Sequence, residues 1–174
     1  MNSEETRSIL DSRALVLARE PEREAAAAEC LSIVEFNLAY ETYGIESSFI
    51  REVFPLKDFT PLPGAPSFVL GIVNLRGRIL SVVDLKVFFG LPARGLGDLN
   101  KVIVIGRGLM EFGILADGII GARTIPLNTV QPPIPTLTGI GAEYLKGVTA
   151  ERVIILDAKR ILEDENIVVR DDAD

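Results

Sequence analysis

Apolar and polar residues alternate with a period of two along much of the chain from Cys30 onward. Within residues 31–45 the apolar positions of this alternation are Val34, Phe36, Leu38 and Tyr40, which is the pattern of a half-buried strand. Further short strands, separated by Gly, Pro or Asp, are predicted at 49–54, 68–75, 78–85, 101–106, 111–116, 119–125 and 152–157. So many short strands with few helices predict barrels or a sandwich rather than alternating strands and helices.

Helical patterns are confined to the N-terminal segment and two short segments further on. Residues 84–90, closed by Gly90, and residues 157–164 are predicted as short helices. Residues 1–29 are predicted as a helical extension in which Pro21 ends the first helix. This extension either docks as a helix or frays.

Two segments of the chain resemble each other. Residues 43–53 (YGIESSFIREV) and 112–122 (FGILADGIIGA) both begin with an aromatic residue, glycine and isoleucine, and both continue into a second apolar strand. This self-similarity predicts two similar small β-units. The alternative is that any two β-hairpins are alike to this extent.

The composition argues against several classes of function. The 174 residues carry a net charge of −7 without a cluster of Lys and Arg, which argues against nucleic-acid binding. Histidine is absent and Cys30 is the only cysteine, so His-dependent nucleophile pairs and cysteine metal cages are excluded. No apolar run approaches the roughly 18 residues of a membrane span, and the first residues are acidic, so we expect a cytoplasmic protein without membrane insertion.

Acidic residues that follow strands have two interpretations. Asp84, Asp117 and Asp157 could each act as a catalytic acid or base, or could cap the next helix or turn by accepting backbone hydrogen bonds. Capping is favoured, since Asp84 and Asp157 stand directly before predicted helices. The Gly-x-Gly within 136–147 follows a proline-rich approach and is typical of a connecting loop rather than a phosphate cradle.

Arg76 lies between two predicted strands that only a tight hairpin can join. Gly77 provides the positive φ that such turns often need. Arg76 is then either a solvated turn residue or a contact at the edge of an apolar surface, as arginines at interface hot spots often are. The physical chemistry of the residues leaves both interpretations open.

The segment FVLGIVNLRGRILSVVDLKVFFGL (68–91) closely resembles the core motif of the CheW-like chemotaxis coupling proteins. In that motif a glycine and apolar residues precede Asn-Leu-Arg-Gly, and an apolar strand ends in Asp-Leu. Residues 43–54, 112–126 and 144–162 are similar to the family's first hairpin, its Gly-apolar-Asp-Gly strand pair, and its closing strand and helix. The resemblance covers residues 30–169 in the same order and spacing.

The resemblance implies a mainly β fold of two small five-stranded SH3-like barrels packed together, with a short C-terminal helix. The expected division is a helical extension (1–29), a CheW-like domain of two barrel subdomains (30–169) and an acidic tail (170–174). The alternative of an enzyme or a small-molecule-binding barrel would need convergent polar groups in one pocket, and the missing histidine and scattered acids argue against it.

The family also implies a non-catalytic adaptor without cofactor, metal or catalytic residues. Its expected partners are the cytoplasmic tip of a chemoreceptor (a methyl-accepting chemotaxis protein) and the regulatory domain of the chemotaxis histidine kinase. The protein would then associate with membrane receptor arrays through these partners. The alternative is a specialised coupling protein for another output, such as pilus motility or second-messenger control.

Two sets of site residues follow from the resemblance. The receptor-binding set is Arg76, Leu75, Gly71 and Ile72. The kinase-binding set, expected on the first barrel, is Val34, Ile45, Ile50 and Glu52, with core burial as the alternative for Val34 and Ile50. The chain departs from the family at Ser81 and Lys86, where the family often has Pro and Arg, and both departures bear on the choice of partner.

Overall fold

The computed structural model describes residues 29–92, 96, 100–133 and 140–167. The predicted helical extension, apart from Glu29, and the acidic tail 170–174 lie outside the described residues. No helix within the described ranges is long and apolar enough to cross a membrane.

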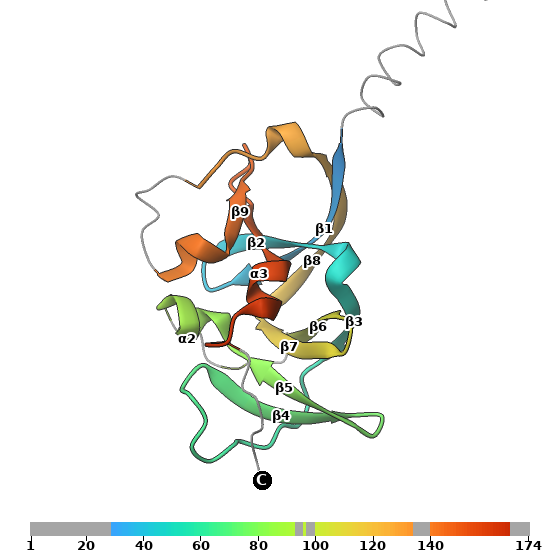
Figure 1. Cartoon of the computed structure of the whole chain (residues 1–174), viewed down its shortest axis with the longest axis vertical. Helices are drawn as coiled ribbons and strands as arrows, with labels where there is room; N and C mark the ends of the chain where they lie inside the picture. The colour runs from blue at the N-terminus through green and yellow to red at the C-terminus, as the bar shows by residue number, and fades with distance from the viewer. Residues whose placement is uncertain (1–28, 93–95, 97–99, 134–139, 168–174) are drawn as a thin grey trace, which may run out of the picture.

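The described chain folds into two five-stranded SH3-like β-barrels packed together, as the resemblance to the CheW-like proteins implies (Figure 1). The first barrel has the strand order β8-β1-β2-β10-β9. Its strands are β1 (Cys30–Leu38), β2 (Glu41–Glu46), β8 (Gly118–Pro126), β9 (Leu145–Val148) and β10 (Ile154–Leu156). The second barrel has the order β3-β6-β7-β5-β4. Its strands are β3 (Ile50–Pro55), β4 (Val69–Leu75), β5 (Arg78–Val83), β6 (Lys101–Arg107) and β7 (Met110–Ala116).

Two short α-helices follow equivalent strands of the two barrels. Helix α2 (Leu85–Phe89) follows β5, and helix α3 (Ala158–Glu163) follows β10. The side chains of Asp84 and Asp157 accept hydrogen bonds from the backbone N–H groups of Lys86 and Arg160, which confirms both predicted caps. Single turns of 3₁₀-helix complete the connections: η1 (Ser47–Phe49), η2 (Leu127–Thr129) and η3 (Ile140–Tyr144).

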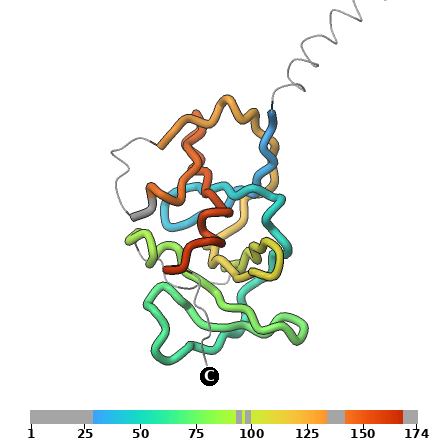
Figure 2. Tube along the Cα trace, in the orientation of Figure 1, coloured from blue at the N-terminus to red at the C-terminus, as the bar shows by residue number. Residues whose placement is uncertain are grey.

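The second barrel is inserted into the first. The chain leaves the first barrel after β2, completes β3 to β7, and returns at β8 (Figure 2). The two crossings, β2 to β3 and β7 to β8, fall on segments 43–53 and 112–122. The sequence similarity between these segments therefore corresponds to equivalent places in two barrels of the same strand order.

Each barrel is closed by the same device. After β3, Thr60 exchanges two backbone hydrogen bonds of 2.8 Å with Ile72 of β4. After β8, Gln131 makes the equivalent pair of bonds with Val148 of β9, at 3.0 and 2.8 Å. In each barrel the bridge ties the segment that follows one edge strand (β3 or β8) to the other edge strand (β4 or β9).

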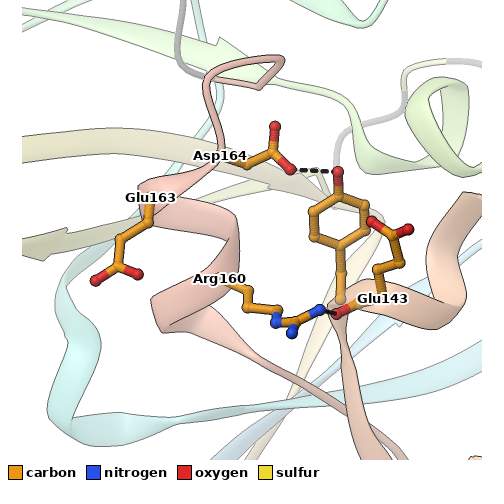
Figure 3. A pocket seen from close by; sticks show the side chains of 5 residues that line it. Glu143, Arg160, Glu163 and Asp164 are labelled. Carbon is orange, nitrogen blue, oxygen red and sulfur yellow. Dashed lines mark hydrogen bonds between the residues drawn. The ribbon is translucent and has the colours of Figure 1, made fainter.

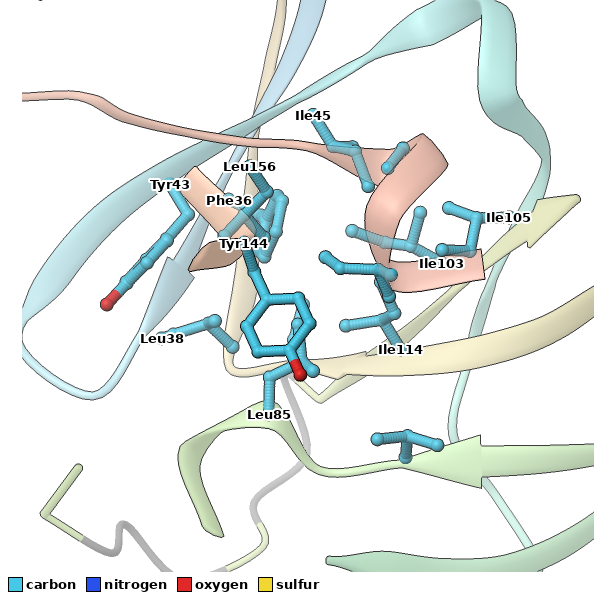
Figure 4. Close-up of a cluster of buried hydrophobic side chains, with 14 of the residues drawn as sticks. Phe36, Leu38, Tyr43, Ile45, Leu85, Ile103, Ile105, Ile114, Tyr144 and Leu156 are labelled. Carbon is cyan, nitrogen blue, oxygen red and sulfur yellow. The ribbon is translucent and has the colours of Figure 1, made fainter. Parts of the chain in front are cut away.

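The buried apolar side chains of the described residues form three clusters. One lies inside each barrel, around Ile33 and Ile155 in the first and around Val102 and Val104 in the second. The third, the central cluster, lies between the barrels and includes Phe36, Leu38, Tyr43, Ile45, Leu85, Ile103, Ile105, Phe112, Ile114, Tyr144, Leu156 and Ile161 (Figure 4). Strands β1, β2, β6, β7 and β10 contribute to it with the faces that point away from their own barrel.

The shared aromatic–Gly–Ile pattern follows from this arrangement. Tyr43 and Ile45 in β2, like Phe112 and Ile114 in β7, point into the central cluster. The glycine between them therefore faces the interior of its own barrel, where a side chain would crowd the inward side chains of the neighbouring strands.

The first part of the alternating pattern is a hairpin rather than one strand. The chain reverses at Ala39, whose φ of 56° lies in the left-handed region and whose N–H donates to Asp117 Oδ2 at 2.7 Å. Tyr40 consequently lies exposed in the turn. Strand β1 is also buried on both faces, with Ile33 inside the first barrel and Phe36 in the central cluster.

The glycine pair provides a test of the barrel interiors. We expect Gly113→Ala to destabilise the protein by about 1–3 kcal/mol, because the added Cβ would lie 2.5 Å from Val102 Cγ1, which is itself buried. Gly44→Ala is the matched control and should cost less, since its Cβ would be 3.0 Å from two isoleucine Cδ1 atoms that can shift. Urea unfolding followed by circular dichroism measures both variants. Equal losses would contradict this account.

Candidate interaction surface at the mouth of the second barrel

Five charged side chains close one end of the second barrel. The β4–β5 and β6–β7 turns lie at this end, because β5 and β7 run parallel and both begin there. We call this end the mouth, and its charged residues the mouth cluster: Arg51, Glu52, Arg76, Arg78 and Glu111. Their ion pairs connect three parts of the chain that are distant in sequence, which are β3, the β4–β5 hairpin and β7.

Each glutamate of the mouth cluster holds two arginines. Glu111 accepts from Arg51 Nη1 and Arg78 Nη1, both at 2.8 Å. Glu52 lies 3.1 Å from Arg76 Nη2 and 3.9 Å from Arg78 Nη2. Arg78 thereby links the two glutamates into one network, and such networks hold side chains in place better than isolated surface pairs do.

A β-bulge directs Arg51 toward the mouth. The register of β3 against β6 shifts between Ile50 and Glu52, so Arg51 is the extra residue. Its guanidinium lies over Gly106, where a Cβ would be 2.5 Å from Arg51 Nε, and its Nη2 donates to the Gly108 carbonyl oxygen at 2.6 Å. Glycine at position 106 is therefore needed for this close approach.

The structure places Arg76 where the sequence predicts it, at the tip of a tight hairpin. Arg76 and Gly77 both have positive φ, 53° and 86°, and the Asn74 side chain accepts from the Gly77 N–H at 2.9 Å. The Arg76 side chain is exposed, so it can contact a partner protein in addition to its ion pair with Glu52.

The other residues of the receptor-binding set are less exposed than Arg76. Leu75 is half-buried against the cluster inside the second barrel, and Ile72 lies half-buried on the outer face of β4. Gly71 is buried, and its Cβ would collide with the carbonyl oxygen of Thr60. That burial contradicts an expected surface contact at Gly71.

Gly71 has a counterpart in the first barrel that explains its role. Gly147 of β9 is approached in the same way by the Gln131 carbonyl oxygen. Both glycines lie at the bridges that close the barrels. Gly71 is therefore required for barrel closure.

The kinase-binding set is divided between the barrels. Val34 and Ile45 pair across β1 and β2 of the first barrel, whereas Ile50 and Glu52 belong to β3 of the second. Ile45 is fully buried in the central cluster, which contradicts a direct contact there. Val34 and Ile50 are half-buried, with Ile50 packed against the central cluster, and Glu52 reaches the mouth beside Arg76.

Several mouth residues were not singled out by sequence reasoning. Arg78 and Glu111 become neighbours only through the pairing of distant strands. Ile79, exposed on the outer face of β5, and Leu109, fully exposed in the β6–β7 turn, extend the surface. Alternation along 78–83 could have indicated Ile79, since Leu80 and Val82 occupy the opposite face.

The sequence model of the CheW-like domain matches residues 32–166 of the chain. The chain belongs to the CheW-like domain family. This result confirms the resemblance recognised in residues 68–91.

Relatives in the CheW-like family match most of the chain. The protein named chemotaxis protein CheW of Treponema pallidum (strain Nichols) is 32% identical over 146 residues, 80% of this chain and 86% of the relative. Protein FrzA of Myxococcus xanthus is 31% identical over 156 residues, 87% of this chain and 92% of the relative. The crystal structure of the scaffolding protein TtCheW from Thermoanaerobacter tengcongensis matches with a TM-score of 0.70 and 31% identity, over 79% of this chain and 91% of that one.

One of the two departures from the CheW-like motif lies inside the molecule. The Lys86 side chain is buried, and its Nζ donates to Asp117 Oδ1 at 2.5 Å. Asp117 also holds the turn at Ala39 and lies where the chain crosses from β7 to β8. Burial raises the pKa of the nearby Asp84, although the positive charge of Lys86 acts in the opposite direction. Lys86 is therefore an internal connection between the barrels, while Ser81 lies half-buried on the outer face of β5.

A pocket of about 220 Å³ lies beside α3 and η3 in this CheW-like chain (Figure 3). Tyr144 Oη donates to Asp164 Oδ2 at 2.5 Å, and Arg160 Nη1 donates to the Glu143 carbonyl oxygen at 3.0 Å. Burial and this bond to Asp164 raise the pKa of Tyr144 to about 12. Burial would by itself raise the pKa of Asp164, but hydrogen bonds from Tyr144 and Asn166 outweigh it, and the pKa is lowered.

Two of the hydrogen bonds thus join polar groups of the pocket to each other. Glu163, which also lines it, pairs with Arg107 at 3.2 Å. Within the described residues, no three or more Cys, Asp or Glu side chains lie together in a way that could hold a metal ion.

The buried ion pair of this CheW-like chain can be tested by removing one charge and then both. Lys86→Met should destabilise the protein by roughly 3–5 kcal/mol, because it leaves the Asp117 carboxylate buried without its cation. Lys86→Met combined with Asp117→Asn should recover much of this loss, since the amide oxygen can still accept from Ala39. Denaturant unfolding compares the two variants. A double variant no more stable than Lys86→Met would contradict this interpretation.

Proposed function

We propose that this protein is a non-catalytic adaptor that couples chemoreceptors to the chemotaxis histidine kinase. The observation that carries the proposal is the exposed Arg76 of the Asn-Leu-Arg-Gly turn, held at the barrel mouth in a CheW-like chain. Support also comes from a relative named chemotaxis protein CheW and a solved structure described as a scaffolding protein.

The proposed receptor surface is centred on Arg76. It includes the accessible parts of Leu75 and Ile72 and extends over the outer face of the β4–β5 hairpin to Ile79. Arginine at the edge of exposed apolar side chains is a common composition of binding hot spots. The receptor's cytoplasmic tip is the proposed occupant of this surface.

The proposed kinase surface adjoins the receptor surface. It comprises Val34 of β1, which pairs with Ile45 of β2, and Ile50 and Glu52 of β3, which follows β2 through η1. Glu52 lies 3.1 Å from Arg76, so the two surfaces meet at one ion pair. An adaptor with adjoining surfaces can hold receptor and kinase side by side. Bound to both partners, the protein would lie on the cytoplasmic side of membrane receptor arrays.

A second candidate is a specialised coupling protein of a pathway with another output, such as pilus motility or second-messenger control. The similarity to FrzA, a relative that does not bear the CheW name, favours keeping this candidate, and this match covers more of the chain than the match to CheW of Treponema pallidum does. Pull-downs with receptor tips and kinase regulatory domains from the same source would separate the two. Capture of the kinase of the flagellar pathway supports the first, and capture of another pathway's kinase alone supports the second.

Arg76→Glu tests the receptor surface. Stability should change by no more than about 0.5 kcal/mol, because Arg76 is exposed, while binding of the receptor tip should weaken by roughly 2 kcal/mol or more. Arg152→Glu is the matched control, since Arg152 is exposed in the β9–β10 turn with a similar φ of 65°. Calorimetric titration with a soluble receptor tip measures the affinities. A large loss of stability with retained binding would mean that Arg76 is structural.

Ile50→Lys tests the kinase surface. The Lys stem can stay against the central cluster while its ammonium reaches water, so the protein should remain folded. Affinity for the kinase regulatory domain should fall, and affinity for the receptor tip should not. Val53→Lys, an exposed position on the same strand, is the control. Unchanged kinase affinity in a folded Ile50→Lys protein would move the kinase surface elsewhere.

A further inference from the structure

Leu109 at the mouth is the most exposed large apolar side chain of the described residues, at 103% relative exposure. Arg107 pairs with Met110 across the end of β6 and β7, so Gly108 and Leu109 form a two-residue turn. Gly108 has a φ of 62°, which suits the first position of such a turn. Single exposed leucines are ordinary on protein surfaces, so the surroundings of Leu109 decide what it can do.

The turn that carries Leu109 is held from two sides. Arg51 donates to the Gly108 carbonyl oxygen at 2.6 Å, and the same guanidinium pairs with Glu111 at 2.8 Å. Glu111 in turn pairs with Arg78. A partner that covers Leu109 therefore has little of the turn left to order, and pre-organisation of this kind strengthens binding.

The charges around Leu109 are arranged with the cations outward. The arginine side chains of the mouth cluster are 81% (Arg76), 50% (Arg78) and 37% (Arg51) exposed, and its glutamates are 23% (Glu52) and 16% (Glu111) exposed. The surface offered to a partner is thus a group of exposed guanidinium groups, on a chain whose net charge is −7. These groups are complementary to carboxylates, which guanidinium groups bind in paired hydrogen bonds.

We propose that Leu109 is an apolar anchor that inserts into a carboxylate-rimmed apolar pocket on the receptor tip, with Arg51, Arg76 and Arg78 facing the carboxylates. This proposal rests on the adaptor function and names the chemistry of the partner at the Arg76 surface. A buried apolar centre inside a polar rim is the usual organisation of a binding hot spot. Leu109 provides the centre and the arginines provide the rim.

The test uses the full chain and a soluble receptor tip. Leu109→Ser should weaken receptor binding by about 30-fold or more, the effect of losing a hot-spot side chain, and should leave the unfolding midpoint unchanged. Ile120→Ser is the matched control, because Ile120 is the exposed bulge residue of β8 in the first barrel. In the receptor tip, changing the rim Asp and Glu residues to Asn and Gln should weaken binding of the wild-type protein to the tip and should reduce the salt dependence of that binding.

The outcomes separate this proposal from the adaptor function. If Arg76→Glu weakens binding of the receptor tip but Leu109→Ser binds it as tightly as the wild type, the adaptor function stands and the role of Leu109 as an anchor is wrong. Loss of kinase binding instead of receptor binding in Leu109→Ser would also overturn it. If the wild type binds no receptor tip, the adaptor function itself fails. A double variant, Leu109→Ser with Arg76→Glu, that loses less than the two single changes combined would support one shared pocket.

Discussion

The cluster between the barrels is the constraint on which the rest of the structure depends. Eighteen buried side chains form it, against six inside the second barrel and five inside the first, counted over the described residues. Each fully buried large apolar side chain contributes roughly 1.5–3 kcal/mol, so exposing this cluster would cost more than the 5–15 kcal/mol that usually stabilises a whole domain. The two barrels are therefore held together in the folded protein, and the surfaces on them keep a fixed relation.

The same constraint explains how one polar pair is tolerated in the interior. Lys86 and Asp117 lie where α2, the β7–β8 crossing and the β1–β2 turn meet. A leucine pair at that place could be as stable, since buried ion pairs often give little net stability. The ion pair also fixes how these segments are oriented, because one carboxylate oxygen of Asp117 accepts from Lys86 and the other accepts from the Ala39 backbone N–H.

Much of the fold could be predicted because its signals are local. Alternation located the strands, Asp84 and Asp157 marked the helix starts, and Gly77 marked the hairpin at Arg76. Alternation shows that a strand has two faces but cannot show that both are covered. For that reason the burial of Ile45 was missed, since it depends on packing against distant strands. The hairpin inside 31–45 was missed for another reason: its turn at Ala39 has no glycine and is held by the distant Asp117.

The candidate surface likewise has features that neighbouring residues predict and features that depend on strand pairing. The tip position of Arg76 follows from residues next to it, whereas its pairing with Glu52, and the pairing of Arg78 with Glu111, depend on strand registers and on the bulge at Arg51. No spacing in the sequence encodes those contacts. Gly71 belongs with these contacts, because it is explained by the close approach of the Thr60 carbonyl oxygen across the barrel, which recurs between Gln131 and Gly147.

The insertion of one barrel into the other has a consequence for the growing chain. All five strands of the second barrel are consecutive, so this barrel can pair its strands as soon as β7 has been synthesised. Strand β1 pairs with β8, which follows the whole second barrel, and β2 needs β10, which comes later still. During synthesis β1 and β2 therefore wait as a hairpin with unpaired edges, and a two-stranded hairpin is at best marginally stable in water. The inserted barrel, with the outward apolar faces of β6 and β7, is the nearest surface on which that hairpin can wait.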